Sequence, residues 1–510
     1  MPVSARWRTG NLGEPFMARV PDIRVRIVNG QPVRPDGRYV VYWMIAFRRT
    51  VSNFALQRAA EAAAEFGRPL VILEPLRTDY PYASDRLHRF ILGGMADNAR
   101  ALDGTPVTYL PYVERARGEG QGLLDALAAD ACLVVTDDFP AFFLPQAIAA
   151  AGARLSVRME AIDSNGIMPV RATPATFSTA HAFRSYIQRT LTEHLPYWPD
   201  DIDFNTLPPP VPLSPTIAER WPMARPQELA DADRLIRTLP VNHAIGAVDL
   251  AGGRRAAEHA LSRFVTEALP RYHEDNRQPE VLGTSRLSPY FHFGHISSHQ
   301  VFSAVMNAER WTTRKLGAGA KGAREGWWGV SAGAEAFLDQ FITWREVGFN
   351  MCVTRPHDYF TFNSLPAWAR ATLTAHAADR RAYLYTRDAF EAADTHDVVW
   401  NAAQRQLVRD GWMHTYLRML WGKKILEWSP SPEAALETMI DIMNAHAIDG
   451  RDPNSYSGYF WTLGRYDRPW APERPVYGTV RYMSSENTVK KLRMKGFLKE
   501  YGPPGAPLLI

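Results

Sequence analysis

The chain has 510 residues, 46% hydrophobic and 22% charged, which is the composition of a soluble globular protein with about two or three domains. A net charge of +4 does not by itself indicate a nucleic-acid partner, because only a clustered basic patch would bind one. The two cysteines, Cys132 and Cys352, cannot supply the four ligands of an iron–sulfur cluster. No apolar run reaches the ~18 residues of a membrane helix and no signal-peptide segment is evident, so we expect a cytoplasmic protein.

The N-terminal third predicts an arm followed by an α/β domain. Residues 1–36 are rich in Arg, Pro and Gly and show no periodicity, so we expect an extended arm. Residues 37–170 alternate β-rich runs with amphipathic helical runs, which predicts a doubly wound domain with a parallel sheet. The predicted strands are 39–45, 70–73, 107–110, 133–136 and 155–159, and the clearest predicted helices are 53–66 and 85–102.

The loop after the first predicted strand excludes a dinucleotide-binding turn. Residues 47–53 read Phe-Arg-Arg-Thr-Val-Ser-Asn and contain no glycine. A dinucleotide turn needs glycine so that the backbone can approach the pyrophosphate. We therefore expect no nicotinamide or flavin diphosphate on the α/β domain.

The remainder of the chain predicts a connector and an all-α domain. Residues 171–240 contain repeated prolines, which favour an extended connector. From 241 to 501 the apolar periodicity is helical. The predicted helices include 256–269, 334–350, 398–428 and 432–446, and the Gly-, Lys- and Trp-rich residues 307–330 are expected to form a surface excursion.

Tryptophans are concentrated in the predicted helical domain. Trp421 and Trp428 are seven residues apart in a helix-forming segment, so they return to nearly the same face about 10 Å further along the axis. Trp400 precedes them. Aligned indoles either pack a core, which is the ordinary use of large aromatic side chains, or relay an electron.

Three polar residues accompany these tryptophans. Arg418 lies three residues before Trp421, Asp449 opens a turn-forming segment, and Asn444 is in the last turn of the helix before it. A buried heterocycle with donors and acceptors along its edge would use this set. A structural ion pair would explain the presence of Arg418 and Asp449 as well as a bound heterocycle does.

The segment 283–297 contains a further candidate site. Its Gly-Thr-Ser-Arg-Leu-Ser-Pro start predicts a helix whose first amides are either an ordinary capped terminus or a phosphate site. His292 and His295 have no acidic or cysteine partner at metal-ligand spacing, so we expect no metal. Neither a P-loop nor a G-x-S-x-G elbow is present.

Taken together, six motifs resemble those of the class II cyclobutane-pyrimidine-dimer photolyases, a branch of the photolyase/cryptochrome family. The similarity extends over about residues 22–485, and its motifs are 37–44, 287–294, 395–401, 413–428, 449–454 and 473–483. It implies that 37–170 is a photolyase-type antenna domain, 171–240 a Pro-rich connector and 241–501 a helical FAD-binding catalytic domain.

The resemblance implies FAD as cofactor, with its reduced form active. The residues that match the family's cofactor site are Tyr272, Leu287, Ser288, Arg418, Asn444, Asp449 and Gly450. Asn444 would face the flavin N5 and accept a bond from the protonated, reduced ring. Trp421, Trp400 and Trp428 would form the photoreduction chain from flavin to surface. The antenna domain would hold a deazaflavin, a folate or no chromophore, and no sequence signature selects among these.

The implied partner is UV-damaged DNA, from which the lesion is flipped into an aromatic slot. The residues that match its binding site are Trp344, Met419, Trp461, Arg468 and Trp470, of which Arg468 and Trp470 would fill the gap in the duplex.

The chain departs from the family at three positions of this slot. Gln340 stands where the family has a glutamate that bonds the pyrimidine carbonyl, and an amide can donate there but carries no mobile proton. Tyr459 and Phe460 replace smaller residues beside Trp461, which would narrow the slot.

The resemblance therefore implies light-driven repair of cyclobutane dimers by electron transfer from reduced FAD. Gln340, Tyr459 and Phe460 leave two alternatives open. One is a repair-deficient, cryptochrome-like blue-light flavoprotein, and the other is a photolyase for a different photoproduct, since a glutamine facing the substrate resembles six-four photolyases. We expect a monomer, nucleoid-associated in a bacterium, without a membrane, metal or iron–sulfur partner.

Overall fold

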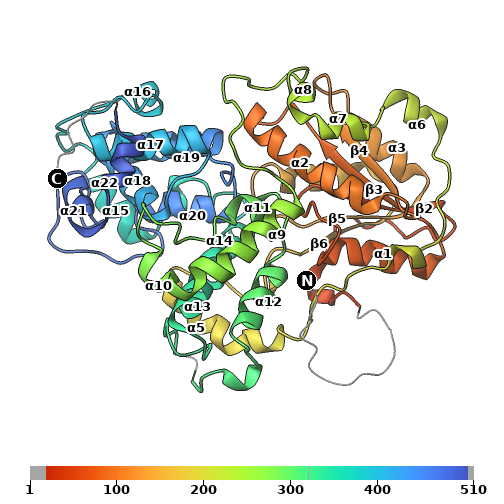
Figure 1. Cartoon of the computed structure of the whole chain (residues 1–510), viewed down its shortest axis with the longest axis horizontal. Coiled ribbons are helices and arrows are strands. Elements are labelled where there is room, and N and C mark those ends of the chain that lie inside the picture. The colour runs from red at the N-terminus through yellow and green to blue at the C-terminus, as the bar shows by residue number, and fades with distance from the viewer. Residues whose placement is uncertain (1–18, 320, 504–510) are drawn as a thin grey trace. The chain divides into compact units, whose positions relative to one another are not determined.

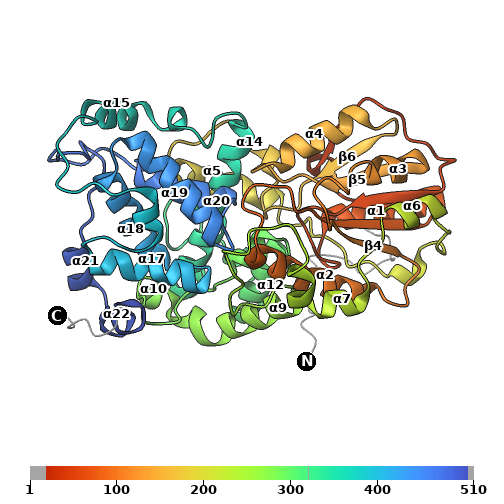
Figure 2. The same cartoon turned by 90° about the horizontal axis from the view of Figure 1, so that it is seen from above.

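The computed structural model describes residues 19–319 and 321–503. Two compact units are interleaved along the chain, one built around a sheet and one mainly of helices (Figures 1 and 2). Unit 1 consists of Met1–Pro174, Thr190–Ser262 and Leu287–Arg310, and unit 2 of Ala175–Arg189, Arg263–Arg286 and Trp311–Ile510.

Unit 1 contains a six-stranded sheet with the order β1-β6-β5-β2-β3-β4. Neighbouring strands are parallel except at the edge, where β1 pairs antiparallel with β6. The strands are β1 Val25–Ile27, β2 Tyr39–Trp43, β3 Leu70–Leu76, β4 Thr108–Val113, β5 Ala131–Asp137 and β6 Met159–Ile162. The predicted α/β alternation is confirmed, and the sheet is mixed rather than wholly parallel.

The expected arm over residues 1–36 is wrong for its second half, because Val25–Ile27 is strand β1. Three residues are too few to show the period-2 pattern by which strands are recognised. Residues 1–18 of the expected arm lie outside the described residues.

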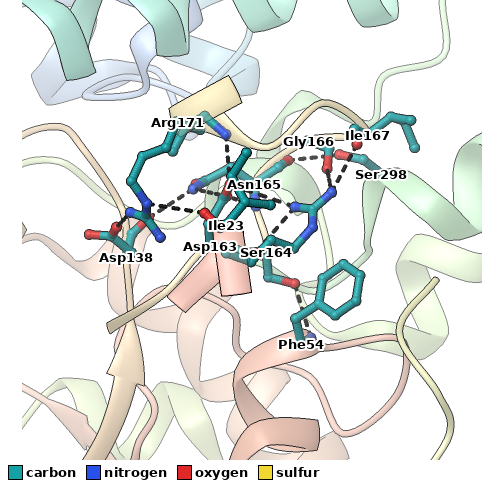
Figure 3. Close-up of polar contacts among 12 residues, drawn as sticks. Ile23, Phe54, Asp138, Asp163, Ser164, Asn165, Gly166, Ile167, Arg171 and Ser298 are labelled. Atoms are coloured by element: carbon teal, nitrogen blue, oxygen red, sulfur yellow. Dashed lines mark hydrogen bonds and ion pairs between the residues drawn. The ribbon is translucent and has the colours of Figure 1, made fainter. Parts of the chain in front are cut away.

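Polar contacts to Asp138, Asp163 and Ile167 hold this edge strand in place (Figure 3). The Arg24 guanidinium is fully buried and donates to the backbone oxygens of Asp163, at 3.2 Å, and Ile167, at 2.8 Å. Asp138 pairs with Arg26 at 2.6 Å and also with Arg171. A buried guanidinium left without these acceptors would be costly, so the contacts fix β1 on the sheet.

Helices cover the sheet. The crossovers β2–α1–β3 and β3–α2–β4 run in the same direction along it, which places α1 and α2 on the same side. Asn53 caps α1, since its side-chain oxygen accepts from the amides of Ala55 and Leu56, and Gly67 ends the helix at φ 60°. The predicted helices 53–66 and 85–102 are confirmed as α1 and α2. The helices of unit 1 are α1 Phe54–Phe66, α2 Asp85–Leu102, α3 Leu123–Ala129, α4 Leu144–Arg154, α6 Pro215–Arg220, α7 Pro226–Ala230, α8 Ala232–Ile236, α9 Arg254–Arg263, α11 Ser288–His292 and α12 Ser298–Ala308.

The expected extended connector over 171–240 is wrong in part, because it contains α5 Ala180–Thr190, which belongs to unit 2, and the three short helices α6 to α8. Its prolines misled the prediction. Pro215 and Pro226 open α6 and α7, where a missing N–H leaves no intrahelical bond unmade.

Unit 2 is built from helices, among which α17, α18 and α19 lie side by side (Figures 1 and 2). The prediction 432–446 is confirmed as α19. The prediction of one helix over 398–428 is wrong, because Gly411 takes φ 65° and ends α17. Besides α5, the α-helices are α10 Tyr272–Asp275, α13 Ala332–Leu338, α14 Arg345–Thr354, α15 Ala367–Ala375, α16 Arg387–Glu391, α17 Val398–Asp410, α18 Thr415–Trp428, α19 Pro432–His446, α20 Pro453–Thr462, α21 Ser485–Lys491 and α22 Lys495–Tyr501.

Two π-helical turns interrupt predicted helices. The turn η5, Phe264–Ala268, follows α9, and the turn η8, Asp339–Trp344, joins α13 to α14. A π-turn widens the helix and is often found at functional sites. The turn η8 carries two of the predicted lesion residues, Gln340 and Trp344.

Three tryptophans anchor the segment 307–330, of which residue 320 lies outside the described residues. Trp311, Trp327 and Trp328 are buried in it, and the Trp311 indole donates to the Trp328 backbone oxygen at 2.6 Å. Glu335 accepts from the amides of Trp327 and Trp328, both at 3.0 Å.

Candidate functional site

Three indoles of unit 2 are in contact, in the order Trp421, Trp400, Trp428. Trp400 stacks on Trp421 with centroids 6.3 Å apart and planes 6° apart, and meets Trp428 at 6.0 Å and 67°. Trp400 is fully buried, and Trp421 and Trp428 are each 2% exposed. The Trp400 indole donates to the Trp421 backbone oxygen at 3.0 Å, and the Trp421 indole to Gln404 at 2.8 Å. The arrangement suits a relay, and it also packs the helical core.

The expectation that Trp428 reaches the surface is wrong, because Tyr385 and His396 cover it with ring centroids at 5.7 and 4.9 Å. The Tyr385 hydroxyl lies 2.8 Å from His396 Nδ1. Tyr383, which is 47% exposed, stacks on His396 at 3.7 Å. The exposed end of this ring series is therefore Tyr383 with His396. The Tyr-x-Tyr spacing of Tyr383 and Tyr385 is the sequence signal for these rings, and neither is among the predicted site residues.

Arg418 and Asp449 form the predicted ion pair. Arg418 Nη2 lies 2.8 and 3.0 Å from the two Asp449 oxygens, and Arg418 Nε donates to the Met413 backbone oxygen at 3.1 Å. The Asp449 carboxylate is buried, and the guanidinium is partly exposed. Gly450 follows in a tight turn, where a Cβ would approach the Met443 oxygen to 2.6 Å. Close packing is therefore sufficient reason for glycine there.

The Asn444 side chain is buried, and its amide orientation is fixed. Its Oδ1 accepts from the Arg451 backbone N–H at 2.8 Å and from the Tyr459 hydroxyl at 3.2 Å. Because a backbone N–H can only donate, the atom that faces Arg451 is the oxygen. The amide nitrogen Nδ2 lies 3.4 Å from the Tyr456 hydroxyl.

The remaining predicted cofactor residues are divided between the units. Tyr272, in unit 2, is buried edge-on against Phe264 and Phe337, with centroids at 5.9 and 5.5 Å. Leu287, which is fully buried, and Ser288 stand at the start of α11 in unit 1. Their place beside a shared cofactor stays a prediction.

Several predicted lesion residues line partly exposed surface. Gln340 is exposed and Trp344 partly exposed on the turn η8, and the Trp344 ring meets Tyr466 edge-on at 6.5 Å. Met419, on α18 next to Arg418, is also partly exposed.

Two guanidinium groups lie against the Trp470 ring, that of Arg468 at 4.4 Å and that of Arg481 at 4.0 Å from its centroid. Arg481 also faces the Trp461 ring at 5.6 Å and pairs with Asp467 at 2.9 Å. Asp467 accepts from the Trp470 indole at 3.2 Å. The structure thus links Trp461 and Trp470 through Arg481 and Asp467. Neither Arg481 nor Asp467 is among the predicted site residues, although Arg481 lies in the motif 473–483.

A buried lysine lies beside Trp461. Lys423 Nζ is 5.3 Å from the Trp461 ring centroid and donates to the Thr462 backbone oxygen at 2.6 Å. Burial lowers the pKa of Lys423 to about 7, with the nearby Asp467 opposing the shift and Arg481 adding to it. A positive charge beside the Trp461 ring is therefore less favoured near neutral pH than for an exposed lysine.

The prediction that Tyr459 and Phe460 narrow the exposed slot is wrong. Both are buried within α20. The Tyr459 hydroxyl points to Asn444, and the Arg465 guanidinium covers the Phe460 ring at 3.6 Å.

Across residues 19–319 and 321–503, no helix combines the length and apolarity needed to cross a membrane. The same residues contain no group of three or more His, Cys, Asp or Glu side chains that could bind a metal ion. Cys132 and Cys352 are both buried as free thiols.

Comparisons with known proteins agree with the fold and with the motifs. No family model matches the chain. A deoxyribodipyrimidine photolyase of Methanothermobacter thermautotrophicus is 32% identical over 476 residues, covering 93% of this chain and 97% of that protein. The Oryza sativa deoxyribodipyrimidine photolyase is 31% identical and covers 93% and 89% of the two chains.

Solved structures show the same fold at low identity. A bacterial class III photolyase from Agrobacterium tumefaciens superimposes with a TM-score of 0.60 at 17% identity, covering 91% of this chain and 86% of that one. A Synechocystis cryptochrome gives 0.62 at 12% identity, covering 91% and 88%. The full-length sequence matches, supported by the shared fold, establish that the chain belongs to the photolyase/cryptochrome family.

Proposed function

We propose that this protein uses light to split cyclobutane pyrimidine dimers in UV-damaged DNA, with reduced FAD as cofactor. The observation that carries the proposal is the pair of partly exposed indoles Trp461 and Trp470, which Arg481 holds together. Large aromatic rings left partly open to solvent beside cationic groups suit flipped bases and DNA phosphates. Two relatives at 31–32% identity are named deoxyribodipyrimidine photolyases, which supports this class of substrate.

The side chains around Asn444 fit the edge of a flavin. The Arg418 guanidinium, the Asp449 carboxylate and the Asn444 amide offer cationic donors, anionic acceptors and a neutral donor from three successive elements of unit 2. A flavin ring presents both donors and acceptors along its edge, so this mixed set complements it. We propose Tyr272, Leu287, Ser288 and Gly450 as the further residues that hold the cofactor. When bound, reduced FAD supplies the electron that splits the dimer under light.

The chain's own residues would bind and orient the lesion. Trp344 and Trp461 would stack on the flipped pyrimidines, at about 1–3 kcal/mol per base. Arg468 and Trp470 would fill the gap left in the duplex, which offsets part of the unstacking cost. Gln340, exposed on η8, would donate its amide N–H to a pyrimidine carbonyl. Met419 would contact the lesion from α18.

The buried indoles would connect the cofactor to the surface. We propose that Trp421, Trp400 and Trp428 pass electrons inward, and that Tyr385 and Tyr383 extend the series to solvent. Each step joins rings whose centroids are within about 6.5 Å, which supports short transfers.

We further propose that residues 37–170 are the place for any antenna chromophore, with deazaflavin and folate as the two candidates, and that residues 241–501 include the catalytic machinery. The expected monomeric state and nucleoid association belong to the same proposal.

The test is illumination of the purified, photoreduced protein with three oligonucleotides, one carrying a cyclobutane thymine dimer, one a six-four photoproduct and one undamaged. Before photoreduction we expect an oxidised-flavin spectrum that bleaches in blue light. After photoreduction we expect loss of the cyclobutane dimer only in the illuminated sample. If the flavin bleaches while the dimer stays intact, the proposed activity is wrong.

A second candidate function rests on Gln340. A glutamine cannot carry the mobile proton of the family's glutamate, which favours a different photoproduct or a light sensor without repair. Repair restricted to the six-four oligonucleotide would support the first of these. Normal flavin bleaching, with equal affinity for damaged and undamaged DNA, would support the second.

A further inference from the structure

The Tyr459 hydroxyl is the feature that carries an inference beyond the proposed function. Its ring is buried on α20, edge-on to Tyr456 with centroids at 5.7 Å. A buried phenol needs a hydrogen-bond partner, and this one finds Asn444 Oδ1 at 3.2 Å. Burial raises the pKa of Tyr459 far above its usual value, so the hydroxyl keeps its proton and remains a donor.

The Asn444 oxygen has no acceptor capacity left. A carbonyl oxygen has two lone pairs, and Asn444 Oδ1 uses both, one on the Arg451 N–H at 2.8 Å and one on the Tyr459 hydroxyl. The backbone donor is itself fixed, because the Arg451 guanidinium donates to the backbone oxygens of Asn444 and Ile448. The turn that follows α19 therefore cannot release Asn444 easily.

The amide nitrogen of Asn444 makes fewer hydrogen bonds than it could. Nδ2 has two hydrogens, and the structure shows one partner for it, the Tyr456 hydroxyl at a long 3.4 Å. The group that Asn444 can still offer to a neighbouring molecule is therefore an N–H, which donates.

We propose that Tyr459 sets the hydrogen-bonding polarity of Asn444, so that the amide presents a donor to the flavin N5 and favours the oxidised ring. The inference rests on the proposed function and on the family resemblance, which implies that Asn444 faces N5 but with its oxygen as the acceptor. The N5 atom of an oxidised flavin is an acceptor, whereas in the reduced ring it carries hydrogen and is a donor. A donor at this position therefore stabilises the oxidised flavin and destabilises the reduced one.

The test compares the flavin-loaded wild-type protein with Tyr459→Phe, which keeps the ring and removes only the hydroxyl. Freeing one lone pair of Asn444 should raise the ratio of reduced to oxidised flavin roughly tenfold at a fixed reductant potential. That ratio equals a shift of about 30 mV for a two-electron couple. Dark reoxidation in air should slow in parallel. An unchanged midpoint potential would overturn the inference.

Two further variants guard against indirect effects. Tyr477→Phe removes another buried hydroxyl of unit 2, one that donates to the Lys423 backbone oxygen at 2.8 Å, and should leave the potential unchanged. In an Asn444→Ala background, Tyr459→Phe should produce no shift, because the group through which it acts is gone. A shift that persists in that background, or an equal shift in Tyr477→Phe, would contradict the role assigned to Tyr459.

The outcomes separate this inference from the proposed function. A wild-type protein that purifies without flavin, and binds none when FAD is added, overturns both. A protein that binds flavin and repairs dimers, but whose potential ignores Tyr459→Phe, overturns the inference alone. A shifted potential in a protein that repairs nothing supports the inference and removes the repair activity.

Discussion

The two tryptophan groups of unit 2 differ in how they are held. Trp400, Trp421 and Trp428 are almost fully buried, touch one another and have hydrogen bonds that fix two of the rings. We call them the relay.

Trp344, Trp461 and Trp470 are partly exposed, and the last two stack against cationic side chains. We call these three the wall. The relay follows the rules of a core and would serve either a repair enzyme or a sensor. Leaving these three rings partly exposed gives up the stabilisation that full burial of an aromatic ring would provide, so core packing does not explain them and a substrate site does.

The largest expected effect is on the relay. Trp400→Ala removes the central indole and should lower the free energy of unfolding by about 3–5 kcal/mol, measured by denaturant titration. It should also block light-driven bleaching of the bound flavin. Trp400→Phe should recover much of the stability but not the bleaching. Normal bleaching in both variants would show that Trp400 is a core residue only.

The wall should respond in the opposite way. Trp461→Ala should weaken binding of a dimer-containing oligonucleotide by about 1–3 kcal/mol, because one stacking surface is lost. The partly exposed ring contributes less to folding, so the unfolding midpoint should change much less than in Trp400→Ala. Affinity for undamaged DNA is the control, and an equal loss for both DNAs would remove Trp461 from the lesion slot.

Acidity should affect the wall through Lys423. Its pKa in the folded protein is lowered to about 7, against about 10.4 when unfolded, so the unfolded state binds more protons between these values. Stability should therefore rise with pH across this window, by up to about 1 kcal/mol per unit, and the penalty should be greatest below pH 7. Denaturant titrations in this range should show the slope in the wild type and a flatter one in Lys423→Met. An identical slope in that variant would assign the effect elsewhere.

The smallest expected effect on stability is that of Arg481→Gln. Its ion pair with Asp467 is partly exposed, so its removal should cost less than about 1 kcal/mol of folding free energy. Because Arg481 contacts both Trp461 and Trp470, the affinity for dimer DNA should nevertheless fall several-fold in a binding titration. Arg409→Gln breaks an exposed pair with Glu500 and is the matched control. Equal affinities in the two variants would mean that Arg481 does not position the wall.

Long periodic segments could be predicted from the sequence, and contacts made by short or irregular ones could not. The helices 85–102 and 432–446 each present several turns of apolar repeat, and they were placed correctly. Strand β1 is three residues long, and the π-turn η8 adds a residue that no apolar pattern records.

The site shows the same division. The Arg418–Asp449 pair could be predicted because each residue lies in a recognisable motif, and the Trp421–Trp428 spacing because both residues lie in one helix. Arg481 contacts Asp467 because the chain turns back over the fourteen positions that separate them. The hydrogen bond from Tyr459 to Asn444 depends on the angle between α19 and α20. Neither contact can be predicted from a local sequence pattern.

Gly411 has a consequence for distance. Had residues 398–428 formed one straight helix, Trp400 and Trp421 would lie 21 positions apart on it, or about 31 Å at 1.5 Å per residue. The left-handed turn at Gly411 folds the chain back, and the same two rings meet at 6.3 Å. Because electron transfer falls steeply with separation, the turn at Gly411 is a condition for the proposed relay.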